Sequence, residues 1–258
     1  MTRYQIVHLQ TVDSTNTYLK SMVEAPEWTC VTADRQTAGR GRQGREWHSA
    51  PGDGLYLSIL LRPASAFRKL TQLSLIAAIA VAETLIELFG GVIGESGANV
   101  DIKWPNDLLV GGRKISGILV ESTGLANGES VRVVVGIGVN LNQTQFPAPL
   151  DATATSCRLV TGQIVDHDSF RDQLLDRFWR WYQHWLAGDS GMILSRWCEL
   201  SSYASGRPVS VELDGQALTG VTAGLDDHGA LLLRTVDGGL RTIIAGEVHG
   251  LRAGSSIT

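Results

Sequence analysis

The stretch VDIKWPNDLLVGGRKISGILVE (residues 100–121) decides the fold class of this chain. Together with the apolar run that follows it, this stretch supplies four strand candidates: 100–104, 107–110, 113–121 and 131–139. Short turns such as Gly111-Gly112 separate the first three, and turns of this kind join strands of a hairpin. We therefore predict a mixed sheet of hairpins rather than repeated βαβ units.

The proline within this stretch marks a turn. Pro105 has a fixed φ and no N–H, so in a sheet it belongs at an edge or a turn, which should aim Asn106 and Asp107 outward. Lys114 begins the next apolar strand, where a positive charge is costly to bury unless it meets an anion. The alternative is a lysine that extends from the strand end into water.

Outward from this centre, alternating or apolar patterns predict further strands at 4–9, 28–33 and 55–61. Residues 13–16, Asp-Ser-Thr-Asn, offer oxygens that can cap a following helix. Helical patterns follow at 70–89, 169–186 and 192–200, and most of the aromatic side chains of the second are expected to pack in the core rather than against a ligand. The predicted class is α/β or α+β, a mixed sheet flanked by helices.

A second domain is predicted at the C-terminal end. From about residue 205 the chain becomes a series of short strands separated by Asp-Gly type turns at 214–215, 227–229 and 237–239. We therefore divide the chain into a large domain, residues 1–204, and a small β-barrel domain, residues 205–258.

Composition excludes several classes of protein. With 258 residues, 43% of them hydrophobic, the chain can bury a large core. A net charge of -4 argues against a general polyanion-binding surface. Three cysteines without C-x-x-C spacing argue against a disulfide framework or a zinc site, and no signal peptide or membrane anchor is recognisable. A cytoplasmic protein is the expectation.

An Arg/Gly loop is the strongest local feature. Residues 35–45 hold four arginines and three glycines with no acidic residue. Glycines let backbone N–H groups approach a phosphate, and guanidinium groups match its oxygens, so the loop indicates an anion site. A solvated basic turn or an RNA-binding segment would explain the charge equally well. The lysine and hydroxyl of a P-loop are absent.

Two glycines lie within one strand candidate, at Gly136 and Gly138. Glycine there indicates either the close approach of a ligand or backbone, or a β-bulge. No Ser, Cys or His carries the pattern of a nucleophile. Catalysis should therefore rest on positioning and charge neutralisation.

Taken together and in order, five motifs resemble those of the biotin protein ligases: DSTN (13–16), Gln36 with GRGRQGREW (39–47), KWPND (103–107), RKISGILVE (113–121) and GIGVN (136–140). The resemblance spans residues 4–142, and the tail ending in GEV (246–248) is similar to the SH3-like C-terminal domain of that family. It implies a catalytic domain related to class II aminoacyl-tRNA synthetases. The implied reaction uses ATP and Mg²⁺ to make biotinyl-5′-adenylate, releases pyrophosphate, and passes biotin to a lysine of a biotin carboxyl carrier domain, as in acetyl-CoA carboxylase.

The resemblance also implies roles for individual residues. Catalytic roles fall on Lys114, Arg40, Arg42 and Asp107. Biotin contacts fall on Ser14, Thr15, Asn16, Gln36, Arg40, Gly41, Arg42 and Lys114. Contacts to ATP or the adenylate fall on Arg42, Arg45, Trp47, Lys103, Asn106 and Asn140. No Mg²⁺ ligands are assigned.

Some family features and rival readings remain open at this stage. Arg252 follows the tail motif one residue later than the family pattern and receives no role. Because the first strand starts near Tyr4, we expect no DNA-binding domain and no DNA partner. The lack of a recognisable membrane anchor leads us to expect no membrane partner, and a homodimer is possible. A lipoate or octanoate ligase and a non-catalytic RNA binder are the alternatives, and the polar Ser14 and Gln36 favour biotin over the first of them.

Overall fold

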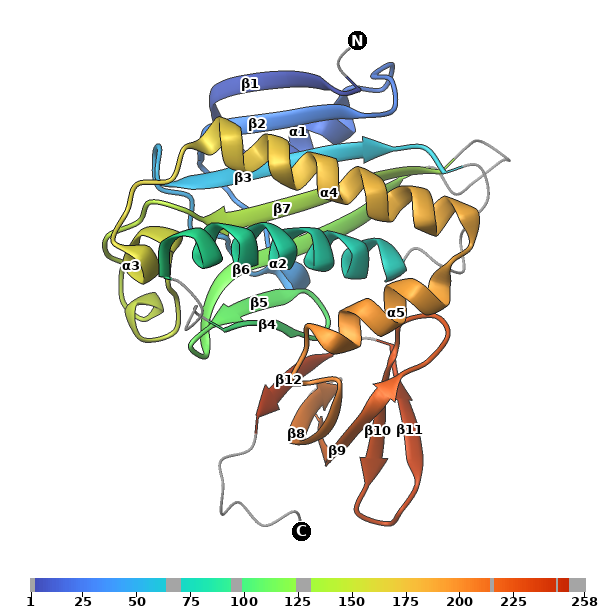
Figure 1. The fold of residues 1–258 in the computed structure, drawn as a ribbon. Helices are drawn as coiled ribbons and strands as arrows, with labels where there is room; N and C mark the ends of the chain where they lie inside the picture. Colours follow the sequence, from blue (N-terminus) through green and yellow to red (C-terminus); the bar gives the residue numbers. More distant parts are fainter. Residues whose placement is uncertain are drawn as a thin grey trace.

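The computed structural model describes residues 3–63, 71–93, 99–123, 131–213, 216–244 and 246–250 (Figure 1). The large domain contains β1 (Gln5–Val12), α1 (Thr15–Ser21), β2 (Thr29–Gln36), β3 (Gly54–Leu61), α2 (Thr71–Ile93), β4 (Val100–Lys103), β5 (Asp107–Val110), β6 (Arg113–Thr123), β7 (Arg132–Asn140), α3 (Cys157–Thr161), α4 (His167–Ala187) and α5 (Ser190–Glu199). The C-terminal part contains β8 (Ser205–Leu213), β9 (Gln216–Leu225), β10 (Leu231–Thr235), β11 (Leu240–Ile243) and β12 (Glu247–Gly250).

A seven-stranded sheet forms the centre of the large domain, in the order β1-β2-β3-β7-β6-β5-β4. Strands β1 and β2 are parallel, and every other neighbouring pair is antiparallel. The predicted mixed sheet of hairpins is thereby confirmed, and the Pro105 turn lies at its edge, between β4 and β5. The pattern was wrong about the ends of the first two strands: β1 runs to Val12 and β2 to Gln36, which pair with each other, so Arg35 and Gln36 belong to a strand and not to the loop. Backbone pairing does not depend on apolar side chains.

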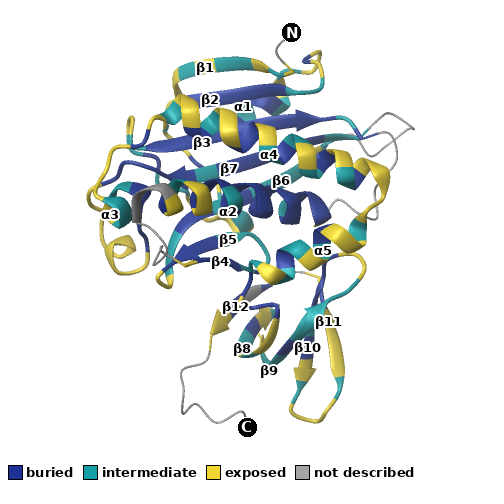
Figure 2. Ribbon diagram, viewed as in Figure 1, coloured by how far each residue is buried: buried dark blue, intermediate teal, exposed yellow. Residues whose placement is uncertain are grey.

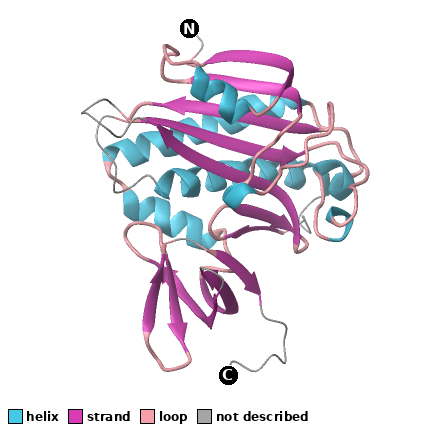
Figure 3. Ribbon diagram, turned by 180° about the vertical axis from the view of Figure 1, so that it is seen from behind, coloured by secondary structure: helices cyan, strands magenta, loops and turns pink. Residues whose placement is uncertain are grey.

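The two faces of the sheet pack against different helices. Side chains alternate between the faces along each strand, so each strand contributes to both. On one face Leu57, Ile59 and the odd-numbered valines of β7 pack against α2 and α4 in the main core. On the other face α1 packs over β2, β3 and β7 through a small cluster that includes Leu19 and Leu60. Figure 3 shows the sheet from this second side.

Helix α2 is the most apolar element. From Leu73 to Ala82 it is apolar around most of its circumference and almost entirely buried between the sheet and α4 (Figure 2). Among the described residues it alone is long and apolar enough to cross a membrane, and its burial inside the protein identifies it as a core helix. In α4, Phe178, Tyr182 and Trp185 are buried as predicted.

The C-terminal domain is a five-stranded antiparallel sheet in the order β11-β10-β9-β8-β12, which confirms a small β domain. It contacts the large domain through the turn after β9. There Trp104 Nε1 donates to Gly229 O at 3.2 Å and Gln72 Nε2 donates to Asp227 O at 2.9 Å. The turn at 214–215 and Arg252 lie outside the described residues.

Candidate active site

A cavity of about 330 Å³ opens on the face of the sheet that α2 and α4 leave free. It is lined by the start of α1, the Arg/Gly loop, the β4–β5 turn and the glycine-containing parts of β6 and β7. All of the residues assigned a role from the sequence line it: Ser14, Thr15, Asn16, Gln36, Arg40, Gly41, Arg42, Arg45, Trp47, Lys103, Asn106, Asp107, Lys114 and Asn140. The fold thus brings the five motifs together, while the role of each residue stays a prediction.

At one end of the cavity, buried polar side chains bond to one another. Ser14 caps α1, and the next residue, Thr15, donates its backbone N–H to Gln36 Oε1 at 2.9 Å. Ser58 on β3 lies 2.8 Å from Thr15 Oγ1 and 2.6 Å from Asn16 Oδ1. Thr15, Asn16 and Ser58 are at most 4% exposed. Such a bonded group can present hydrogen-bonding atoms to a ligand at little cost in side-chain entropy.

The carboxylate of Glu121 bonds to the side chains at this end of the cavity. Glu121 on β6 accepts from Asn16 Nδ2 at 3.0 Å and from Lys20 Nζ at 2.7 Å, and lies 3.1 Å from Arg40 Nη1. Burial favours the neutral carboxyl, but the hydrogen bonds from Lys20 and Asn16 and the charges of Lys20 and Arg40 outweigh it and lower the pKa of Glu121. Glu121 is therefore a carboxylate at neutral pH.

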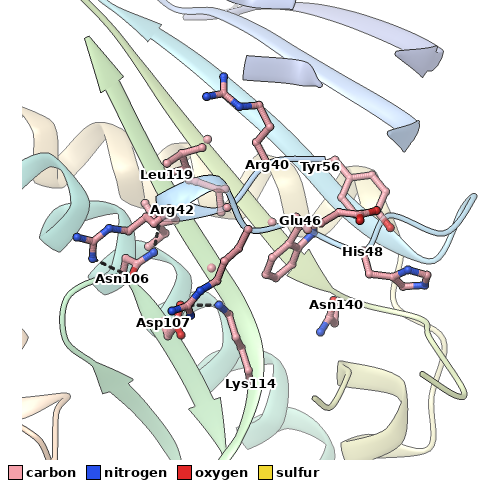
Figure 4. Close-up of a pocket in the computed structure, with 18 of the residues that line it drawn as sticks. Arg40, Arg42, Glu46, His48, Tyr56, Asn106, Asp107, Lys114, Leu119 and Asn140 are labelled. Carbon is pink, nitrogen blue, oxygen red and sulfur yellow. Dashed lines mark hydrogen bonds and ion pairs between the residues drawn. The ribbon is translucent and has the colours of Figure 1, made fainter. Parts of the chain in front are cut away.

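The Arg/Gly loop is a short closed turn over the cavity. Trp47 N donates to Gly39 O at 2.9 Å, and Gly41 N donates to Arg45 O at 2.7 Å. Figure 4 shows Arg40 pointing away from Lys114 while Arg42 points to the β4–β5 turn, where its Nη1 donates to Asn106 Oδ1 at 3.4 Å. Arg40 and Arg42 thus each have a partner within the protein, Glu121 for the first and Asn106 for the second, although the Arg40 side chain stays 47% exposed.

Trp47 rests on a floor of paired glycines. Gly117 on β6 and Gly138 on β7 are cross-strand partners, and a Cβ atom on Gly138 would lie 2.5 Å from the indole ring. A Cβ atom on Gly136 would lie 2.3 Å from Asn16 Oδ1. The strand register is continuous through both glycines, so the bulge interpretation was wrong, and close approach of side chains is the reason for glycine here.

Lys114 and Asp107 face each other at the other end of the cavity. Lys114 Nζ lies 2.7 Å from Asp107 Oδ1 and 5.4 Å from the centre of the Trp47 ring (Figure 4). The pairing register between β5 and β6 shifts beside Lys114. Such an irregularity turns side chains away from the directions they would have in a regular strand pair. The Lys114 side chain remains 36% exposed, so its charge is accessible to an anion.

Comparison with known proteins decides the family. Residues 8–140 match the model of the biotin/lipoate A/B protein ligase family, and residues 204–249 match the biotin protein ligase C-terminal domain. The chain belongs to this family. It is 36% identical to the biotin--[acetyl-CoA-carboxylase] ligase of Paracoccus denitrificans over 221 residues, which is 84% of this chain and 88% of the relative.

Further relatives of the biotin protein ligase type agree. The bifunctional ligase/repressor BirA of Bacillus subtilis is 39% identical over 232 residues, 87% of this chain and 67% of that protein. A structure of biotin protein ligase from Aquifex aeolicus in complex with biotin and ATP superposes with a TM-score of 0.78 at 32% identity, covering 96% of this chain and 99% of that one. The chain is thus a biotin protein ligase by sequence and by fold.

Some residues of this biotin protein ligase site escaped the sequence analysis. Ser58 and Glu121 bond to the predicted residues from neighbouring strands, and Tyr56 and His48 line the cavity directly. Gly246 and Val248 bring the C-terminal domain to the cavity wall. Alternation along β3 could have placed Ser58 on the face opposite Leu57, but its partners are distant in sequence.

Metal-binding side chains are few. Within the described ranges, no group of three or more His, Cys, Asp or Glu side chains could hold a metal ion. The cavity does contain the Asp107 carboxylate, and Mg²⁺ is commonly held by one or two carboxylates together with substrate phosphates. The donor set therefore fits an Mg²⁺ ion that arrives with a nucleotide and does not fit a resident protein-caged ion.

Proposed function

We propose that this chain is an ATP-dependent ligase that converts biotin to biotinyl-5′-AMP and transfers it to a lysine of a biotin carboxyl carrier domain, as of acetyl-CoA carboxylase. The observation that carries the proposal is the single cavity lined by all five motifs. The relatives add support, since the Paracoccus denitrificans protein is a biotin--[acetyl-CoA-carboxylase] ligase and the Aquifex aeolicus structure holds biotin and ATP.

The first step brings two anions together. A carboxylate oxygen of biotin attacks the α-phosphorus of ATP, the bond to the bridging oxygen breaks, and pyrophosphate leaves. Negative charge then gathers near the α-phosphate, and Lys114 and Arg42, both in the cavity wall, are the groups that can neutralise it. Asp107 holds the Lys114 ammonium in place until a phosphate competes for it.

The second step forms the amide. The amine of the carrier lysine attacks the acyl carbon of the adenylate, AMP leaves with the bonding electrons, and the amine loses a proton. Neither step needs a protein nucleophile, so the charged and polar groups of the cavity wall act by positioning the substrates and neutralising charge. Mg²⁺, coming in with ATP, would neutralise phosphate charge, and Asp107 and Glu46 are the carboxylates of the described cavity wall that could hold it.

Biotin is favoured over lipoate by the buried polar end of the cavity. Thr15, Asn16 and Gln36 are bonded to neighbouring polar groups and line the cavity, so their remaining acceptor sites can add hydrogen bonds to the N–H groups of a urea ring, which a dithiolane ring lacks. A cytoplasmic site of action and a possible homodimer stay predictions from the sequence.

Isotope exchange tests this function. Labelled pyrophosphate should enter ATP only when biotin is present, and lipoate should not replace biotin. A purified carrier domain incubated with the enzyme, biotin and ATP should gain the mass of one biotinyl group. Exchange that is equal with and without biotin would exclude biotin adenylation.

A further inference from the structure

The hydrogen bonds at the polar end of the cavity have a direction, and Glu121 sets it. A carboxylate can only accept hydrogen bonds, so the Asn16 side chain must present its NH₂ group to Glu121 Oε2, 3.0 Å away. The same NH₂ group reaches Leu119 O at 3.3 Å. Both amide hydrogens of Asn16 are therefore used on β6, and its Oδ1 atom faces β3.

The next links follow from the number of hydrogens available. Asn16 Oδ1 cannot donate, so the Ser58 hydroxyl, 2.6 Å away, must donate to it. The Ser58 hydrogen is then spent. Thr15 lies between Ser58 at 2.8 Å and Gln36 Oε1 at 3.1 Å, and its single hydroxyl hydrogen goes to one of these two oxygens. In either case Thr15 Oγ1 has no hydrogen left for the cavity.

The charged partners of Glu121 hold its other oxygen. Lys20 from α1 lies 2.7 Å and Arg40 from the Arg/Gly loop 3.1 Å from Glu121 Oε1. Glu121 Oε1 contacts two cations and Oε2 accepts from one amide. These contacts fix the orientation of the Glu121 carboxylate and of the Asn16 amide bonded to it. The contact between Arg40 and Glu121 also links the start of the Arg/Gly loop to β6, and Arg40 itself lines the cavity.

We propose that Glu121 is a positioning residue for biotin: it orients the Asn16 amide, so that the Ser58 hydrogen goes to Asn16 and leaves the lone pairs of Thr15 Oγ1 available as acceptors, and it anchors Arg40. A ligand N–H group, such as those of a cyclic urea, is the partner that such an acceptor requires. The proposal rests on the proposed function, since it names how the same cavity recognises biotin.

The isosteric variant Glu121→Gln is the sharpest test. Its oxygen would turn to Lys20 and Arg40, because an NH₂ group cannot face two cations, and its NH₂ would then face Asn16. The Asn16 amide would then either face an NH₂ group or rotate, and rotation loses its hydrogen bond to Leu119 O and reverses the one to Ser58. We expect the Kd for biotin, measured by calorimetry without ATP, to rise by about tenfold despite equal side-chain size. The Kd for a non-hydrolysable ATP analogue should change by less than about twofold.

A double-mutant cycle with Ser58→Ala tests the connection between the two residues. Ser58→Ala alone should raise the Kd for biotin by about fivefold, but in the Glu121→Gln background, where Asn16 no longer needs that hydrogen, by less than about twofold. Fully multiplicative effects would overturn the role of Glu121 in orienting Asn16. A folded Glu121→Gln variant with wild-type biotin affinity would overturn it as well.

Glu83 on α2 provides the matched control. Its side chain is 23% exposed, close to the 18% of Glu121, and it accepts hydrogen bonds from Trp181 and Arg196 outside the cavity. Glu83→Gln should leave biotin affinity unchanged. If Glu121→Gln does not fold, Ser58→Ala in the wild-type background decides, since unchanged biotin affinity there would overturn the proposal. A wild-type protein that does not bind biotin would instead refute the proposed function.

Discussion

At one end of the cavity polar side chains are buried and bonded to one another, whereas at the other the charges lie at strand ends and on a loop, open to solvent. Asn16 is 4% exposed and bonded on both sides of its amide, while the Lys114 side chain is 36% exposed and paired with Asp107. The first end suits a neutral, rigid ring that needs fixed donors and acceptors. The second suits phosphates, whose charge replaces that of a protein partner.

Removal of the Lys114 ammonium from the charged end of the cavity should reduce activity more than any other change proposed. Lys114→Ala is expected to slow biotin-dependent pyrophosphate exchange by about two orders of magnitude or more, since the main charge donor of the transition state is lost. Arg113→Ala is the matched control, because that side chain bonds to Asp151 O at the surface. Activity of Lys114→Ala within about tenfold of wild type would refute the assignment.

Two glycines on β7 allow each end to be disturbed separately. A Cβ atom at Gly136 would collide with Asn16 and one at Gly138 with Trp47. Gly136→Ala should weaken biotin binding, and Gly138→Ala should weaken binding of an ATP analogue, each by about tenfold or more, because neither contact can be relieved without moving a side chain of the site. Calorimetry with each ligand on both variants measures this. Equal losses of both ligands in both variants would contradict the separation of the ends.

Amide hydrogen exchange should show that the backbone at the two ends of the cavity responds differently to the ligands. The residues 39–45 turn holds few backbone hydrogen bonds, and its arginines gain a phosphate partner only with the nucleotide. Addition of biotin and ATP should slow exchange in this turn on the order of tenfold, while the Thr15 amide, already bonded to Gln36, changes much less. Unchanged exchange in the turn would show that it does not close over the adenylate.

Acid should weaken the buried end through Glu121, with the smallest effect. Its pKa is lowered in the folded protein, so its contribution to stability is complete above the ordinary glutamate pKa of about 4.3 and is lost as the pH falls through the lowered value. Urea unfolding of wild type and Glu121→Gln should show a free-energy difference that is constant near neutral pH and shrinks below about pH 4. A difference independent of pH would mean that the carboxylate is not favoured by folding.

Local sequence patterns were sufficient for most of the architecture. Short turns and apolar runs predicted the hairpins of β4 to β7, and an all-round apolar pattern predicted the buried helix α2, since both follow from periodicity and turn chemistry. The end of β2 was missed because main-chain pairing with β1 carries Arg35 and Gln36 into the sheet without any apolar signal.

The residues of the site were likewise predicted only in part from the sequence. Motif resemblance named the residues that line the cavity, although composition alone left the Arg/Gly loop open to an RNA-binding interpretation. Ser58 lies outside the motifs, and Glu121 ends the motif at 113–121 but received no role. Both bond to Asn16, which is 42 positions from Ser58 and 105 positions from Glu121 along the chain.

The amino-acid sequence alone determined a mixed sheet and a small C-terminal β domain, because these depend on local conformation, and the resemblance of its motifs named the residues that gather at the cavity. Only the tertiary structure decided the direction of the hydrogen bonds at the buried end and the need for glycine beneath Trp47. Those depend on distances between strands that are remote in sequence, and a hydrogen bond or a steric contact changes within a fraction of an ångström.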